Sequence, residues 1–124
     1  MASPSALAAG AKAPLQIVVS REQQSLVVYD GDTVVATSKV STGKAGHATP
    51  TGIFSILEKR RRHESNIYSN APMPFMQRLN WYGVALHAGE IPGYPASHGC
   101  IRMLIPDVIE LYDQVPVGAP VYIA

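Results

Sequence analysis

Apolar and polar residues alternate along the early part of the chain in short runs rich in β-branched side chains. The runs cover residues 15–20, 25–29 and 33–41, and polar turn segments separate them at 21–24 and 30–32. Short β-branched runs bounded by turn residues are typical of antiparallel strands. The pattern therefore predicts a three-stranded meander at the start of the fold.

The middle of the chain breaks this alternation. Residues 42–52 contain several glycines and a proline, which predicts an exposed, shaped loop, and 53–57 resume a strand. Residues 58–80 are charged at first and then rich in Pro, Met and Asn, which predicts an irregular connection. Connections of this length are often lids or binding loops, and a solvated, mobile excursion is the alternative.

The last part of the chain contains the only helical pattern. Residues 81–87 predict a buried strand that ends in a histidine, and 88–96 carry two glycines and two prolines that exclude regular structure. Pro106 is followed by an acid and by apolar residues near helical spacing, which predicts a helix. Residues 120–124 predict a final edge strand.

Six or seven short strands with one helix predict a mostly-β domain, either two packed sheets or a partly closed barrel. With 124 residues, 47% of them hydrophobic, the chain can form one domain with its own core. Residues 1–14 are rich in Ala, Ser, Pro and Gly and predict a flexible linker without an export signal, which leaves 15–124 as the domain.

Charge and hydropathy narrow the classes of function. The formal net charge is +1, so no strong field of the whole molecule attracts nucleic acid or an anionic membrane. No apolar run approaches the roughly 20 residues that a membrane-spanning helix needs. We expect neither nucleic-acid binding nor membrane insertion by this segment.

Cys100 is the only cysteine, so it is either a small buried hydrophobe or a reactive thiol. A free thiol has a pKa near about 8.5, so a reactive cysteine normally has a histidine within reach. His87 and His98 are available, and the Gly/Pro-rich segment lets the chain bring His87 back to the thiol. Acyl transfer also needs hydrogen-bond donors for the developing oxyanion, and we expect the backbone amides of Gly99 and Cys100 to supply them.

Residues 87–102, His-Ala-Gly-Glu-Ile-Pro-Gly-Tyr-Pro-Ala-Ser-His-Gly-Cys-Ile-Arg, resemble the active-site motif of the L,D-transpeptidase family, also called the YkuD domain. That motif has an upstream histidine, then Ser/Thr-His-Gly-Cys, a hydrophobic residue and Asn or Arg. Upstream, Val-Ser-Thr-Gly at 40–43 and Thr-Pro-Thr-Gly-Ile-Phe at 49–54 resemble the family's other recurrent stretch. The likeness runs from about residue 15 to the C-terminus.

The resemblance implies a β-sandwich fold of two packed sheets, with the cysteine on a loop and the main helix after it. It implies an enzyme that acts on peptidoglycan tetrapeptide stems in the periplasm or cell wall, with no cofactor and no metal. Cys100 would attack the carbonyl between the third stem residue and the terminal D-Ala. An amine of a second stem, or of an envelope protein, would then take the acyl group.

By the same resemblance, His87 is the general base and later the general acid, and a backbone carbonyl orients it. His98 would shape the loop and contribute its amide or its ring near the thiol. The sequence departs from the family in a short spacer after His87 and in Ala88, where Gly or Ser is common. The shorter spacer bears on the acceptor channel, whereas Ala88 matters little if only its backbone carbonyl is used.

Several residues are weaker candidates for substrate contact. Arg102 could bind a substrate carboxylate, or pair with Asp107 or Glu110. Ser97 is expected to orient the loop by hydrogen bonding. A lid over the site could be formed by Tyr68, Met73, Met76 and Trp81, with core packing as the rival and the preferred reading for Trp81. The basic stretch 59–62 is either a carboxylate-binding patch or a solvated face.

Three alternatives remain open from the residues alone. Water could replace the amine as acceptor, giving an L,D-carboxypeptidase or amidase. A zinc-binding module could use His87, His98 and Cys100, although two ligands separated by one residue fit a tetrahedral ion poorly. A wall-binding domain with inactive catalytic residues is the third.

Overall fold

The computed structural model describes residues 15–65 and 71–124, so the predicted linker and Tyr68 lie outside the described residues. The strands are β1 (Leu15–Ser20), β2 (Ser25–Asp30), β3 (Thr33–Ser41), β4 (Gly52–Ser55), β5 (Glu58–Arg60), β6 (Met76–Arg78), β7 (Ala85–Ala88), β8 (Ile101–Met103) and β9 (Pro120–Ile123). The helix is α2 (Ile105–Gln114), which follows the loop that carries Cys100. Within the described part of the chain, no helix has the length and apolar character needed to cross a membrane.

The predicted meander is confirmed. β1 pairs antiparallel with β2, and β2 pairs antiparallel with β3. Side chains along β1 alternate between buried and half-buried, which places Leu15, Ile17 and Val19 in the core. The alternation of apolar and polar residues in the sequence therefore gives the sheet one face that packs on the core.

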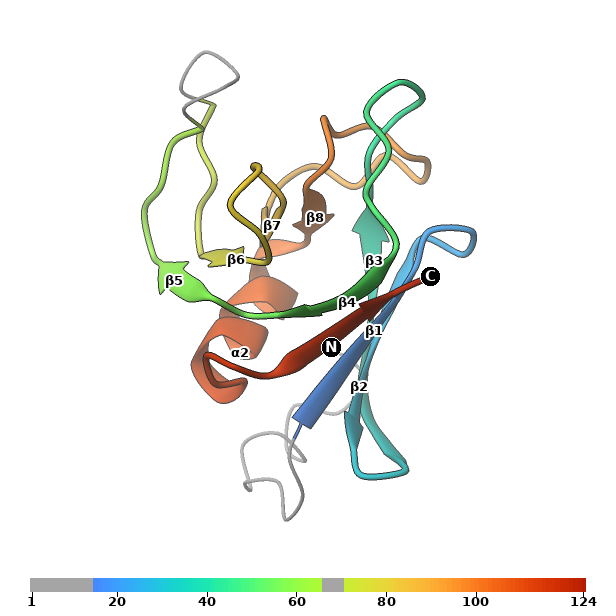
Figure 1. Ribbon diagram of the computed structural model, residues 1–124, viewed down its shortest axis with the longest axis vertical. Coiled ribbons are helices and arrows are strands. Elements are labelled where there is room, and N and C mark those ends of the chain that lie inside the picture. Colours follow the sequence, from blue (N-terminus) through green and yellow to red (C-terminus); the bar gives the residue numbers. More distant parts are fainter. Residues whose placement is uncertain (1–14, 66–70) are drawn as a thin grey trace.

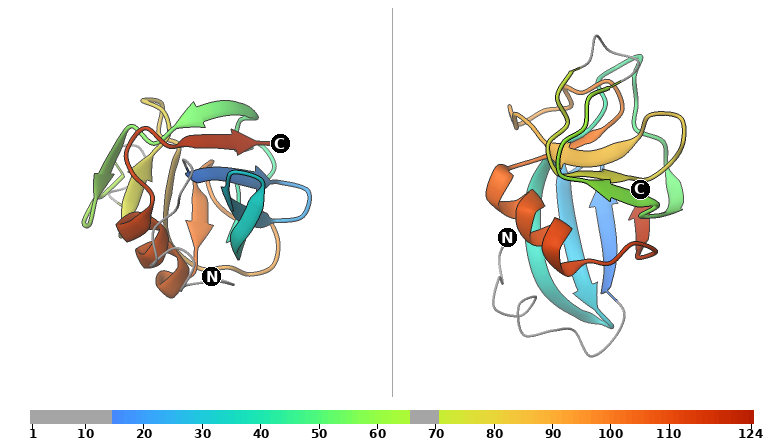
Figure 2. Two further views of the ribbon diagram at one scale, coloured as in Figure 1. Left: turned by 90° about the horizontal axis from the view of Figure 1, so that it is seen from below. Right: turned by 90° about the vertical axis from the view of Figure 1, so that its left-hand side faces the viewer.

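The nine strands of the described residues form one curled sheet in the order β4-β9-β1-β2-β3-β8-β7-β6-β5 (Figures 1 and 2). β3 joins its two halves, because it pairs with β2 along most of its length and with β8 at Val40 and Ser41. Buried residues of both halves share one core cluster, among them Val28 and Leu86. The mostly-β fold with one helix is therefore confirmed for residues 15–65 and 71–124, and the two expected layers are halves of a continuous sheet.

The last strand is not at an edge, contrary to the prediction. β9 lies between β4 and β1, parallel to β1 and antiparallel to β4. Val121 and Ile123 on this strand are buried. The apolar end of the chain therefore fills an interior position of the sheet.

Residues 58–65 and 71–80 are more regular than predicted. β5 and β6 pair as a hairpin, and hydrogen bonds continue its ladder from Phe75 to Arg61 and from Met73 to His63. The charged sequence suits β5 because it is the edge strand, where one side meets water. β8 is a further short strand that the sequence did not predict.

The predicted strand at 81–87 is partly wrong. β7 begins only at Ala85, and Trp81, which was expected in the core, is 68% exposed. Tyr82 is 88% exposed. The Asn80 side chain explains the difference, because its Oδ1 accepts hydrogen bonds from the amides of Tyr82 and Val84 at 3.0 Å each and closes a turn before the strand.

A substitution at Leu86 tests how much burial in the core contributes to the free energy of unfolding. Its side chain is fully buried, and β7, on which it lies, packs against α2. We expect Leu86→Ala to lower the free energy of unfolding by about 2–5 kcal/mol, because it leaves a cavity in that core. Urea denaturation measures this. Ile53→Ala, at a position 75% exposed, is the matched control and should change stability far less; equal losses would contradict the assigned core.

Candidate active site

The parallel pairing of β7 with β8 sets the geometry of the site. Leu86 lies opposite Ile101, and His87 lies opposite Arg102. Leu86 and Ile101 are fully buried in the core, so their sequence neighbours project from the other face of the sheet. Cys100 directly precedes Ile101, and this places the thiol on the same face as the His87 ring.

A cavity of about 260 Å³ opens on that face. It brings together five of the residues that the sequence singled out: His87, Ser97, His98, Cys100 and Arg102. Residues of the extended β5–β6 hairpin line its other side, among them Ser65 and Met73. Cys100 is partly exposed and not a core residue, as a reactive thiol requires.

His87 is held by its own strand. Its Nδ1 lies 2.7 Å from the carbonyl oxygen of Ala88. A carbonyl oxygen only accepts, so Nδ1 carries the proton and Nε2 keeps a lone pair. Burial lowers the pKa of His87; the bond to Ala88 opposes this effect, and the Arg102 cation adds to it. The ring is therefore a neutral base, and Ala88 contributes to its orientation through the backbone.

The Cys100 thiol donates a hydrogen bond to the carbonyl oxygen of Gly83 at 3.1 Å. Burial raises the pKa of this thiol, and the Ala85 amide and the Arg102 cation oppose that rise. A raised thiol pKa beside a lowered imidazole pKa favours the neutral pair over thiolate and imidazolium in the resting site. Gly83 was not singled out from the sequence, because a carbonyl acceptor leaves no side-chain signal.

Ser97 holds the loop of residues 96–100, which carries Cys100. Its hydroxyl donates to the carbonyl of Cys100 and accepts from the Gly99 amide at 3.1 Å. Gly99 has a φ of +126°, which strongly favours glycine there. Because Ser97 already occupies the Gly99 amide, the prediction that this amide serves the oxyanion is corrected, and the Cys100 amide is the remaining candidate of the two.

The upstream motif supports the loop from behind. Thr49 is buried, and its hydroxyl donates to the Gly99 carbonyl at 2.7 Å and accepts from the Gly43 amide at 2.9 Å. A Cβ on Gly43 would overlap the His47 carbonyl, so glycine is required there. The Thr42 carbonyl accepts from the Ala96 and Ser97 amides at 3.0 Å. The sequence pointed to this motif through resemblance, without revealing its role.

His98 lies at the exposed rim of the cavity. Its ring meets the His47 ring edge to face, with centroids 5.0 Å apart and an interplanar angle of 86°. Weak desolvation by neighbouring atoms lowers the pKa of His98, and the Lys44 cation and His47 lower it further. His98 lines the cavity, and its contribution near the thiol stays a prediction.

Arg102 lies in the cavity wall, where its side chain packs against Gly89 and its guanidinium donates to the Ala96 carbonyl at 3.4 Å. Asp107 is buried and accepts a hydrogen bond from Ser38. The position of Arg102 favours the carboxylate-binding alternative over a partner on α2.

Met76 is not placed to contact a substrate, contrary to the prediction. It is fully buried and packs with Met73 and Ala85 in a cluster that supports Cys100. Met73 belongs to the same cluster and also lines the cavity. Both methionines therefore shape the floor under the thiol.

Two cations of the basic stretch are engaged within the chain. The Lys59 ammonium donates to the Tyr112 carbonyl at 2.6 Å, and Arg60 pairs with Glu58 at 3.5 Å. Among the described residues, no group of three His, Cys, Asp or Glu side chains is arranged to hold a metal ion. The zinc alternative therefore has no ligand set in this part of the chain.

Comparisons with known proteins agree with this geometry. The family model of the L,D-transpeptidase catalytic domain, YkuD, matches residues 14–123. A Bacillus licheniformis protein named as the L,D-transpeptidase YkuD is 33% identical over 116 residues, which cover 89% of this chain and 66% of that protein.

Solved structures of L,D-transpeptidases also resemble this chain in sequence and fold. A Stackebrandtia nassauensis L,D-transpeptidase is 30% identical with a TM-score of 0.83, over 93% of this chain and 57% of that one. An L,D-transpeptidase solved in complex with imipenem is 25% identical with a TM-score of 0.81, over 89% of this chain and 58% of that one. The chain thus spans somewhat less than two thirds of each of these relatives.

A substitution at Thr49 tests how much its hydrogen bonds stabilise the loop that carries Cys100. Thr49→Val keeps the volume and removes the hydroxyl, so the Gly99 carbonyl and the Gly43 amide lose a partner. We expect the free energy of unfolding to fall by about 1–3 kcal/mol for each buried group left unsatisfied. Chemical denaturation measures the loss. Thr49→Ser keeps the hydroxyl and is the control; a loss in Thr49→Val no larger than that in Thr49→Ser would contradict the assigned role of the two hydrogen bonds.

Proposed function

The chain belongs to the L,D-transpeptidase catalytic-domain (YkuD) family, and from this premise we propose that it is a cysteine-dependent L,D-transpeptidase of peptidoglycan stems. One observation carries the proposal: Cys100 and His87 share one face of the β7–β8 pair and one cavity, and the bond from His87 Nδ1 to Ala88 leaves Nε2 free. This is the arrangement that nucleophilic catalysis by a thiol needs.

The first half of the reaction forms a thioester. Cys100 Sγ attacks the carbonyl carbon between the third stem residue and the terminal D-Ala while His87 Nε2 accepts the thiol proton. The Cys100 amide donates to the oxygen that becomes negative. The tetrahedral intermediate collapses, the bond to D-Ala breaks, and His87 returns the proton to the departing amine.

The second half transfers the acyl group. An amine from a second stem, or from an envelope protein, attacks the thioester carbonyl, and His87 accepts its proton. Collapse expels the Cys100 thiolate, which recovers the proton from His87, so the site returns to its neutral resting pair. No cofactor is consumed in this sequence. Because stem peptides are wall components, the domain would act in the periplasm or cell wall.

The Arg102 guanidinium is placed to recognise an anionic substrate. It lies in the cavity wall beside His87, and stem peptides carry free carboxylates. A planar guanidinium can bind a carboxylate through two parallel hydrogen bonds. We assign Arg102 to substrate binding on this basis.

Intact-protein mass spectrometry after exposure to a carbapenem tests the nucleophile and the base. A relative in this family was solved in complex with imipenem, which makes that compound the natural probe. We expect an adduct on the native chain and none on Cys100→Ala. His87→Gln should slow adduct formation by about 10²–10⁴-fold, because it removes the base. A His87→Gln variant that acylates at the native rate would remove this residue from the mechanism.

The same measurement on a disaccharide-tetrapeptide separates the two acceptors. A crosslinked dimer with loss of D-Ala supports transfer to an amine. Tripeptide as the sole product would contradict transfer to an amine and indicate an L,D-carboxypeptidase. If neither an adduct nor a product forms with any substrate, the proposed activity is wrong, and a wall-binding module is the alternative.

The pH profile tests the neutral resting pair. Because burial lowers the pKa of His87 below its ordinary value of 6.5, the rate of acylation should rise with pH through a midpoint below 6.5 and then stay level through neutral pH. Arg102→Gln removes a cation that lowers this pKa, so the midpoint should move to higher pH. Acylation rates by mass spectrometry across pH measure both. A limb that rises only near the ordinary thiol pKa would show that thiol ionisation controls the step.

A further inference from the structure

The turn between β6 and β7 exposes two aromatic residues beside the catalytic cavity. Trp81 is 68% exposed and Tyr82 is 88% exposed. Large aromatic side chains usually bury most of their surface, and an exposed pair at the rim of a pocket is typical of a binding surface. The mechanism proposed above uses neither ring.

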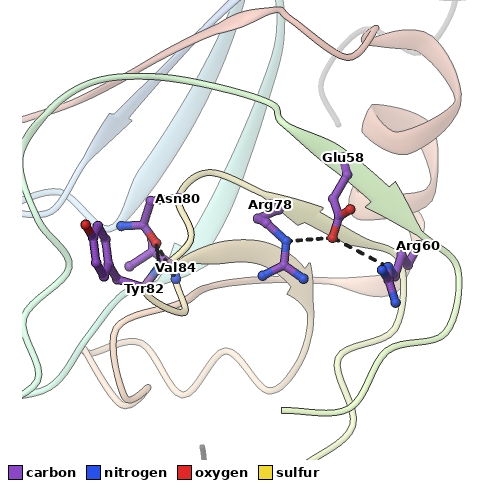
Figure 3. Close-up of polar contacts among 6 residues, drawn as sticks. All are labelled: Glu58, Arg60, Arg78, Asn80, Tyr82 and Val84. Carbon is purple, nitrogen blue, oxygen red and sulfur yellow. Dashed lines mark hydrogen bonds and ion pairs between the residues drawn. The ribbon is translucent and has the colours of Figure 1, made fainter. Parts of the chain in front are cut away.

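The turn is rigid, as a preformed binding surface should be. Asn80 Oδ1 accepts from the amides of Tyr82 and Val84 (Figure 3). The Leu79 amide donates to the Val84 carbonyl at 2.9 Å. The Arg78 guanidinium lies 4.9 Å from the centre of the Trp81 ring. Glu58 fixes that guanidinium through a bond of 2.6 Å (Figure 3). The backbone and Trp81 therefore lose little freedom when a ligand binds.

The turn is continuous with the catalytic cavity. Gly83, the next residue, lines the cavity, and its carbonyl accepts the hydrogen bond of the Cys100 thiol. A substrate carbonyl attacked by Cys100 therefore lies close to this turn. An extended tetrapeptide spans no more than about 14 Å, so the sugar that carries a stem stays near the thiol during the reaction.

We propose that Trp81 and Tyr82 form a sugar-binding surface that holds a pyranose ring of the glycan strand while the attached stem occupies the catalytic cavity. The proposal rests on the proposed function for the identity of the substrate. The C–H groups on a pyranose face carry partial positive charge and suit the negative face of an aromatic ring. Arg78 and Asn80 beside the rings offer polar groups of the kind that sugar hydroxyls bind.

Trp81 is the only tryptophan of the chain, so its fluorescence reports on this surface directly. In the Cys100→Ala chain, which cannot turn over, we expect a peptide-free oligosaccharide of alternating N-acetylglucosamine and N-acetylmuramic acid to change the emission in a saturable way. Tyr82→Ala in the same chain should weaken binding roughly ten-fold. Ile53→Ala, an exposed apolar position on β4, is the matched control and should bind as the parent does. If the emission does not change up to the solubility limit of the sugar, the proposal is wrong, and a protein partner becomes the alternative ligand of this turn.

Kinetics give a second readout that does not depend on the fluorophore. The native chain should show a lower KM for disaccharide-tetrapeptide than for free tetrapeptide, and Trp81→Ala should remove most of that difference, whereas Trp81→Phe should keep part of it. Equal losses with both substrates would mean that Trp81 is only structural. If neither substrate reacts, the proposed function fails, while the fluorescence titration still decides sugar binding independently.

Discussion

The parallel pairing of β7 with β8 is the constraint on which the site depends. Its register is fixed by hydrophobic burial, because Leu86 and Ile101 lie opposite one another and both are fully buried. A slip of one residue would turn His87 toward the core and a core residue toward the cavity. The placement of base and thiol is thus a consequence of core packing, and the surrounding polar contacts refine it.

Backbone carbonyls, not carboxylates, arrange the reacting groups. Ala88 orients the imidazole and Gly83 holds the thiol, while Thr49 and Ser97 satisfy the polar backbone of a loop without regular structure. Neutral partners add no buried charge to the site. The raised pKa of Cys100 and the lowered pKa of His87 favour a protonated thiol beside an unprotonated imidazole, and the proposed mechanism then places proton transfer in the chemical step.

The elements that depend on residues close together in the sequence were predicted from local sequence patterns. The meander and α2 followed from alternation and helical spacing, and the motif pointed to His87 and Cys100, which line one cavity. β5, β6 and β8 were missed because each has three residues and depends on partners distant in sequence. Trp81 was placed in the core by its residue type, whereas the Asn80 turn delays the strand. The role of Thr49 depends on a contact with Gly99 that spans 50 positions.

Gly83 connects the chemistry of the cavity with the surface beside it. In the proposed mechanism the thiol leaves the Gly83 carbonyl before His87 takes its proton, and rotation of the Cys100 side chain between staggered positions would be enough for this step. Hydrogen bonds to Asn80 hold the turn that carries Gly83, so this turn remains fixed while the thiol moves. A rigid turn can then serve two purposes: it fixes the resting thiol on one side and presents its aromatic rings on the other.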